Sequence, residues 1–490
     1  MLVSIKFSIF LLALCCAVGA LAAPSQASQD LSKRDWIGDI WDKIFGHKSA
    51  TTTPAAPPSR TPPPAHATTA AHAPAVTTPP AKHGATTTPA RTNAPTTPTH
   101  APPAPPPPPS QPADPNAQGD LNPKTELAPL ARLEARMGKF NRVFDTLPVK
   151  GAAANIPWPS TYWPSYLDGA NYRWQGSNQL SPVEKYAKSF SWNAQQLADQ
   201  VSYQHGIDSA KGRSCFTDWQ CGSGAACVGR RGTGIFGKRY CVATWEGICD
   251  GWTGAALMLP EPKCSVTGPK GVEFTVGDLK GLMSSYFAAE NGKHTSEISM
   301  AARCNTENPR KDENGYYTDA TCDDATAGML HIFVTNWFQK SKTGFAFDRD
   351  TTAQVWNQPV YGYSVKSSRD VTHAQALNLL GQSFHIDSRT TRIVRVQTEI
   401  NWVSETSHWS DLSLPTSEVA DSVLDATTYD YLLFLDTHGE IIGGEYFGDS
   451  KNDQPDFFWA PFAVEQNGVA YTAIKYQELL ALWNKSVACN

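Results

Sequence analysis

The chain has 490 residues, a formal net charge of −5 and a sequence pI near 6.2. This length accommodates one large or two medium globular units besides unstructured segments. Because the sequence has no basic stripe, its charge argues against nucleic acid as a partner.

The first 22 residues have the pattern of a secretory signal peptide. Lys6 supplies a positive charge, residues 7–18 are apolar, and the small residues at 20–22 form a cleavage site. The apolar run is shorter than the roughly 20 residues that cross a bilayer. We therefore expect a secreted, extracellular protein without a transmembrane segment.

Two further segments separate this signal from the globular part of the chain. Residues 23–48 are a candidate pro-segment, with a dibasic pair and a short amphipathic helix. Residues 49–120 contain no Phe, Trp, Tyr, Leu or Ile and are dominated by Thr, Pro and Ala. This composition predicts a disordered stalk, because it cannot bury enough apolar surface to offset its ordering entropy. The globular region is then expected at 121–490.

The cysteine count singles out one thiol. Removal of the signal peptide leaves nine cysteines, and an odd number in a secreted protein leaves at least one unpaired. The segment 215–241 holds four of them among glycines, which predicts a disulfide-stapled insert. A zinc site is the weaker alternative there, because the spacing lacks a Cys-X-X-Cys pair.

Cys249 is the best assignment for the unpaired thiol. Its segment, WEGICDGWTGAALM, predicts a loop followed by a short helix that begins at Cys249 and turns Trp252 and Ala255 inward. A helix N-terminus favours the thiolate and lowers the pKa of a cysteine. We therefore predict a nucleophile, with a structural half-cystine or an inert buried thiol as the alternative.

A cysteine used for acyl transfer needs a histidine as proton shuttle and a third group that orients it. His331 lies in the apolar run MLHIFV, which predicts a buried strand, and Asp348 ends a second predicted strand. The chain order of cysteine, histidine and acid resembles that of papain-like enzymes. We predict His331 and Asp348 as the catalytic partners, with Asp350 as a second orienting acid. The alternative for His331 is an ordinary core histidine.

Several strings resemble those of one known family. Residues 355–363, VWNQPVYGY, closely resemble the core of the surface peptide that plants perceive in oomycete transglutaminase elicitors. The strings WEGICDGW, MLHIFVTNWF and YDYLLFLDTHGEIIGGEY resemble the nucleophile loop, the histidine segment and the C-terminal strands of that family, in the same order. The family usually has an Arg or similar residue where Tyr361 stands, and commonly a His where Asp250 stands.

The resemblance implies an α+β fold with a papain-like, cysteine protease-type catalytic core and additional family-specific domains. It implies calcium-dependent transglutaminase activity, in which Cys249 attacks a protein glutamine, His331 shuttles the proton and Asp348 holds the imidazole. A lysine amine then resolves the thioester and leaves an isopeptide bond. Two alternatives remain, a secreted papain-like cysteine protease and a catalytically diverged surface or elicitor protein.

The resemblance also implies partners and an exposed elicitor motif. The partners are proteins that present Gln and Lys side chains, including those of a cell wall, and a plant surface receptor. An acceptor channel that favours amine over water needs apolar walls. Candidates for these walls are Trp245, Trp252, Trp337 and Trp356. The elicitor motif comprises Val355, Trp356, Asn357, Gln358, Pro359 and Val360.

Calcium and a glycan have weaker support. Asp319, Asp323 and Asp324 cluster along the chain and offer carboxylate oxygens, but they lack EF-hand spacing. Solvated loop acids are the alternative. The sequon at 484–486 predicts a glycan on Asn484.

Overall fold

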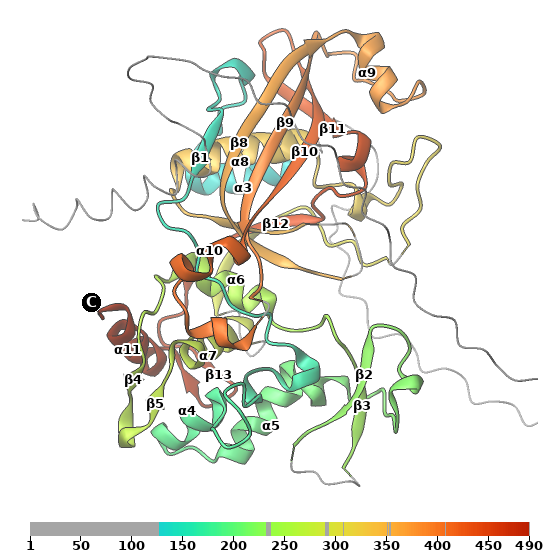
Figure 1. Ribbon diagram of the computed structural model, residues 1–490. Helices are drawn as coiled ribbons and strands as arrows, with labels where there is room; N and C mark the ends of the chain where they lie inside the picture. Colours follow the sequence, from blue (N-terminus) through green and yellow to red (C-terminus); the bar gives the residue numbers. More distant parts are fainter. Residues whose placement is uncertain are drawn as a thin grey trace, which may run out of the picture. The chain divides into compact units, whose positions relative to one another are not determined.

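The computed structural model describes residues 127–231, 237–289, 294–306, 308–349, 351, 354–406 and 408–489 (Figure 1). The expected signal peptide, pro-segment and stalk lie outside the described residues, and so does Asp350. No described helix is long and apolar enough to cross a membrane. The described chain mixes helices with antiparallel strands, which agrees with the α+β prediction.

The largest sheet has eight strands. Its path runs β11-β10-β9-β8-β7-β12-β6, and β1 pairs with β8 beside that path. Each of these pairings is antiparallel. The long strands β8, β9 and β10 run side by side (Figure 1). The strands are β1 (Lys150–Ala152), β6 (Thr295–Met300), β7 (Phe345–Asp348), β8 (Asn357–Val371), β9 (Arg392–Val403), β10 (Leu424–Leu435), β11 (Ile441–Tyr446) and β12 (Phe457–Val464).

Helix α8 (Ala327–Lys340) packs against this sheet and fills its main core. Its Phe333 contacts the rings of Phe345 from β7 and Phe458 from β12, while Thr326 caps its N-terminus. The strand predicted for this segment is therefore wrong. An apolar run that is buried on all sides has no periodicity that separates helix from strand. Only its length, 14 residues, favours a helix.

Helix α6 (Cys249–Met258) lies between helix α7 (Val276–Ala288) and the strands β7, β8 and β12. The two helices cross closely at Gly251, where a Cβ would lie 2.3 Å from the carbonyl oxygen of Ser284. A side chain at this position would push the helices apart, so glycine fixes where the first turn of α6 sits. Trp252 in that turn is fully buried, as the sequence predicts.

The four cysteines of 215–241 form two disulfides, as predicted, and β2 (Ala225–Gly229) pairs with β3 (Arg239–Ala243), a pairing that was not predicted from the sequence. Among the described cysteines, Cys249 is the one left free. The disulfides are Cys215–Cys227, Cys221–Cys241, Cys264–Cys489 and Cys304–Cys322.

The remaining elements cover the lower half of Figure 1 and the periphery of the sheet. The further helices are α3 (Ala128–Met137), α4 (Pro182–Phe190), α5 (Ala194–His205), α9 (His373–Leu380), α10 (Thr416–Val423) and α11 (Tyr476–Val487). Two short hairpin sheets pair β4 (Val266–Thr267) with β5 (Glu273–Phe274) and β13 (Val469–Ala470) with β14 (Ile474–Lys475).

Candidate functional site

The free thiol of Cys249 lies at the N-terminus of α6, where the sequence predicts it. The residue is 8% exposed, so the sulfur is nearly enclosed. The thiol donates to the carbonyl oxygen of Val355 at 3.6 Å, and the side-chain amide of Asn357 donates to the sulfur at 3.7 Å. Both partners come from the VWNQPV segment, which therefore forms one wall of the Cys249 site.

The side chain of Asn357 is held in one orientation. Trp459 Nε1 donates to its Oδ1 at 2.7 Å, and Thr253 donates to its backbone carbonyl at 2.9 Å. An indole nitrogen can only donate, so the amide oxygen must face Trp459. The amide NH2 group must then face Cys249, which aims a hydrogen-bond donor at its sulfur.

The surroundings of the Cys249 thiol favour its protonated form. Burial raises the pKa of Cys249, the carboxylates of Asp250 and Glu405 act in the same direction, and hydrogen bonds from Asn357 oppose them. The helix N-terminus alone predicts the opposite shift, so enclosure outweighs the helix effect here. A base must take the thiol proton before or during attack.

Asp348 ends β7, as predicted, and is fully buried. It is the direct ladder partner of Asn357, and its Oδ1 accepts a hydrogen bond from the backbone N–H of Trp356 at 3.0 Å. Asp348 therefore helps to fix the backbone that presents Val355 and Asn357 to the sulfur. The structure does bring Asp348 into the neighbourhood of Cys249.

His331 does not lie in that neighbourhood. Its Nδ1 is 2.8 Å from the hydroxyl of Tyr431, and burial lowers its pKa to about 3. Tyr431 pairs with Val396 of β9, which pairs with Ser368 of β8. The Tyr431 hydroxyl itself lies 2.7 Å from Thr398 Oγ1, and Thr398 pairs with Val365, which is 8 residues along β8 from Asn357, or roughly 25 Å at about 3.3 Å per residue. We correct the assignment of His331 as proton shuttle, because it is a core histidine.

A cavity of about 360 Å³ opens beside Trp356. Sequence reasoning missed most of its lining, because Glu405 and His408 sit in an irregular segment after β9 with no local pattern. Trp356 was expected as a channel wall and does line the cavity, whereas Trp245, Trp252 and Trp337 do not. The lining includes Tyr162, Tyr166, Trp356, Glu405, His408 and Trp409.

The VWNQPV segment is largely buried, which corrects the expectation of an exposed motif. Val355 and Trp356 are partly accessible, but 357–363 is enclosed between β7 and β9. Tyr361, which departs from the family pattern, is itself 7% exposed. Residues 357–360 of the segment begin β8, which lies between β7 and β9, and Val355 and Asn357 supply the carbonyl and the amide that contact Cys249.

The acidic cluster is only partly assembled. Asp319 caps its own turn by accepting from Thr321, and Asp324 Oδ2 accepts from the N–H of Ala302. Burial raises the pKa of both Asp323 and Asp324 to about 7. Asp324 Oδ1 is buried without a hydrogen-bond partner among the described residues. Across the described chain, the three metal-capable ligand atoms that come within 4.8 Å of one another are disulfide sulfurs, not these carboxylates.

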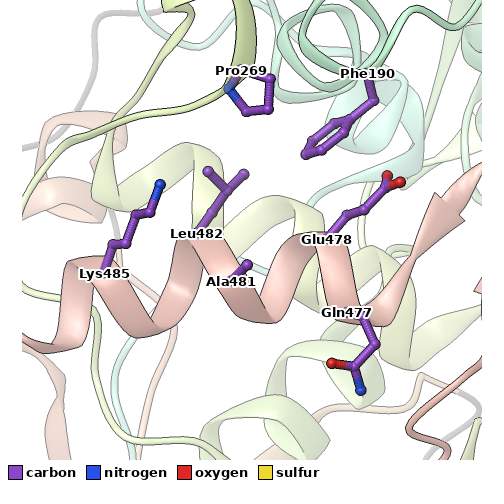
Figure 2. A pocket seen from close by; sticks show the side chains of 7 residues that line it. All are labelled: Phe190, Pro269, Gln477, Glu478, Ala481, Leu482 and Lys485. Carbon is purple, nitrogen blue, oxygen red and sulfur yellow. The ribbon is translucent and has the colours of Figure 1, made fainter.

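A second cavity, of about 300 Å³, lies along one face of α11 (Figure 2). Glu478, Leu482 and Lys485 project into it from the helix, opposite Phe190 and Pro269. It contains no nucleophile and shares no residue with the Cys249 site. Asn484 is exposed on the same helix.

Comparisons with known proteins agree with one another. The family model described as Transglutaminase elicitor matches residues 129–489. The chain is similar to the crystal structure of the GP42 transglutaminase from Phytophthora sojae, with 32% sequence identity and a TM-score of 0.63. That similarity covers 74% of this chain and 98% of the other. No curated protein matches the chain in sequence.

Proposed function

The chain belongs to the transglutaminase elicitor family, and we propose that it forms isopeptide bonds between glutamine and lysine side chains of extracellular proteins through a thioester on Cys249. The observation that carries this proposal is the geometry at the sulfur. Among the described cysteines it is the one free thiol, it opens a helix, and an oriented amide donor faces it.

The site can stabilise the charge that develops during acyl transfer. When Cys249 attacks a γ-carboxamide, negative charge moves to the carboxamide oxygen. The backbone N–H of Cys249 has no acceptor within its helix, because it opens the first turn. This N–H and the amide of Asn357 are the two donors that we assign to the oxyanion. Ammonia leaves, and the glutamyl group remains on the sulfur as a thioester.

The proton acceptor must differ from the one predicted by sequence. Among the described histidines, His408 lines the cavity beside Trp356, and we assign it the role first given to His331. No hydrogen bond joins His408 to Cys249 in this geometry, so His408 has to move inward when substrate binds. Asp348 acts by positioning, because it holds the backbone of Trp356.

Calcium fits the acidic cluster in part. Asp323 and Asp324 are buried carboxyls, and Asp324 offers an oxygen with no hydrogen-bond partner among the described residues. A bound calcium ion would favour their ionised forms and supply a fixed positive charge near this loop. Backbone and water oxygens would have to complete the six to eight ligands that calcium takes.

The proposal extends to location and partners. Disulfides suit an oxidising, extracellular setting, and cell-wall proteins with accessible Gln and Lys side chains are the proposed substrates. A plant receptor that recognises the VWNQPV segment would need the chain opened or cleaved, because most of the segment is buried. A glycan on Asn484 is compatible with its exposure.

A catalytically diverged binding protein is the second candidate. Two observations favour it: burial raises the pKa of the enclosed Cys249 thiol, and the hydrogen-bond partners of its sulfur among the described residues are Val355 and Asn357 rather than a histidine. A papain-like protease shares the thioester chemistry but uses water as the acceptor.

One experiment separates the three. Full-length secreted protein and its Cys249→Ala variant are incubated with a glutamine-rich protein and a fluorescent primary amine, with calcium or with chelator. Amine incorporation that requires Cys249 supports the transglutaminase. Fragments without incorporation would indicate a protease, and the absence of both would indicate the diverged protein.

A further inference from the structure

We propose that the cavity between Trp356 and Glu405 is the binding site for the primary amine, such as a lysine side chain, that resolves the thioester. The inference rests on the proposed function and names the acceptor site of that reaction. Four features of the cavity carry it: its position, its walls, its charge and its route for protons.

The position of the cavity suits an acceptor. Trp356 stands between Val355, whose carbonyl accepts from the thiol, and Asn357, whose amide donates to the sulfur. Tyr162 also lines the cavity, and its carbonyl accepts from the backbone N–H of Ile248, the residue before Cys249, at 2.7 Å. The Glu405 carboxylate is also close enough to raise the pKa of the Cys249 thiol.

The walls suit an alkyl chain that ends in a cation. Tyr162 and Trp356 meet edge to face with ring centroids 5.4 Å apart. The Tyr162 hydroxyl donates to the carbonyl oxygen of Thr244 at 2.8 Å. The rings of Tyr166 and Trp409 complete an aromatic lining. Aromatic faces attract ammonium groups, more strongly when water is excluded.

Glu405 supplies the charge that selects an amine. It is the carboxylate of the cavity lining, and both its oxygens accept from the neutral amide of Gln358, at 2.8 and 3.0 Å. Among the described residues no Lys or Arg forms an ion pair with Glu405, and Arg349 acts on it only from farther away. A partly enclosed carboxylate without a cationic partner favours a ligand that brings one. The uncharged carboxamide of a glutamine gains nothing comparable here.

Glu405 can also carry the protons of the acceptor step. Burial raises the pKa of this carboxyl, which makes it a better proton acceptor than a solvated glutamate. It takes one proton from the ammonium and releases it to solvent. The neutral amine then attacks the thioester carbonyl, so that a C–N bond forms and the C–S bond breaks. Glu405 takes the second amine proton and delivers it to the departing sulfur of Cys249.

The test measures partition between amine and water. The full-length protein is given a glutamine peptide and increasing Nα-acetyl-lysine amide, and isopeptide product and hydrolysed peptide are both counted. Glu405→Gln removes the charge but keeps the shape. We expect the ratio of isopeptide to hydrolysis at a given amine concentration to fall about tenfold or more. Glu399→Gln, which removes a half-buried carboxylate of β9 that pairs with Lys366, is the matched control and leaves the ratio unchanged.

A second measurement does not depend on turnover. Nα-acetyl-lysine amide is titrated into the Cys249→Ala variant by calorimetry, with and without Glu405→Gln. Binding that weakens about tenfold with the added substitution supports the site even if the wild type forms no thioester, which would defeat only the proposed function. A partition ratio or an affinity that Glu405→Gln leaves unchanged would overturn the acceptor site.

Discussion

Helices α6 and α8 both lie against the same sheet, and each buries a residue of the kind that performs catalysis. Cys249 of α6 contacts the carbonyl of Val355 and the oriented amide of Asn357, and Trp356 between these two residues lines a cavity. His331 of α8 lies inside the main core and is satisfied by Tyr431. The comparison teaches that residue type and burial alone do not separate a candidate nucleophile from a core residue, whereas the hydrogen-bond partners of the side chain do.

The largest effect should come from Cys249→Ala. Because no other described cysteine is free, removal of this thiol should lower amine incorporation by about 10³-fold or more. The measurement is the initial rate of fluorescent amine incorporation. A circular dichroism melt is the control, and the substitution should move it little because only the sulfur is lost. Retained incorporation would place the nucleophile elsewhere.

Asn357→Ala tests the amide donor at the same site. Loss of one oxyanion donor should lower kcat by roughly 10²-fold, with a smaller change in KM. Trp459→Phe is the matched variant, because it keeps an aromatic ring but removes the donor that orients Asn357. It should lower kcat by about tenfold. A purely structural role for Asn357 would instead lower the melting temperature while kcat per folded molecule stays constant.

The buried motif gives a contrast within one strand. Side chains at 366–370 of β8 are exposed, whereas those at 357–363 are enclosed. An antibody raised against a peptide of residues 355–363 should bind the unfolded chain roughly tenfold better than the native protein, because binding requires local opening. An antibody against 366–370 should show a much smaller difference. Equal binding of the first antibody to both forms would contradict the burial of the motif.

His331→Gln probes the other side of the comparison. We expect a loss of about 1–3 kcal/mol in the free energy of unfolding, because Tyr431 loses a well-placed partner. Amine incorporation per folded molecule should stay within about twofold, since the residue is remote from Cys249. Denaturant midpoints and initial rates measure the two effects. A rate loss without a stability loss would restore His331 as a catalytic residue.

The His331→Gln variant should also change how the free energy of unfolding depends on pH. The folded-state pKa of His331 is lowered to about 3 from an ordinary value of 6.5. As the pH falls from about 6.5 toward 3, the unfolded chain therefore binds a proton at His331 that the native chain does not bind. The stability linked to His331 is therefore fully present above about pH 6.5 and is lost progressively as the pH falls toward 3. His331→Gln should flatten this acid-side loss, apart from the contribution of the carboxyl groups.

Local patterns in the sequence were sufficient for some features of the fold and the site. The start of α6 at Cys249, the free thiol, the disulfides of the segment 215–241 and the end of β7 at Asp348 all follow from nearby residues and cysteine parity. The conformation of α8 does not, because its run is apolar on every side. The roles of Asn357 and Glu405 depend on contacts with Trp459 and Gln358, which are distant in sequence, and no local spacing encodes them.

The smallest predicted effect concerns Asp324, whose environment resembles that of Cys249 in one respect: burial opposes its charge. Its pKa is raised from 3.8 to about 7 by burial, so the native chain holds a proton that the unfolded chain has released. Without calcium, stability is therefore complete below about 3.8 and falls as pH rises toward 7. Asp324→Asn removes this loss, so the variant should melt slightly above the wild type at pH 7.5 in chelator.

Calcium should reverse the order of the two melting temperatures, so that the wild type melts above the Asp324→Asn variant. If Asp324 is a ligand, the wild type gains stability on binding the ion and the Asp324→Asn variant gains less. The measurement is the melting temperature at pH 5 and pH 7.5, with calcium and with chelator, and Asp425→Asn on β10 is an exposed control. If the wild type still melts below the Asp324→Asn variant when calcium is present, Asp324 is not a calcium ligand. The pH dependence of the melting temperature in chelator would still measure the cost of burying the Asp324 charge.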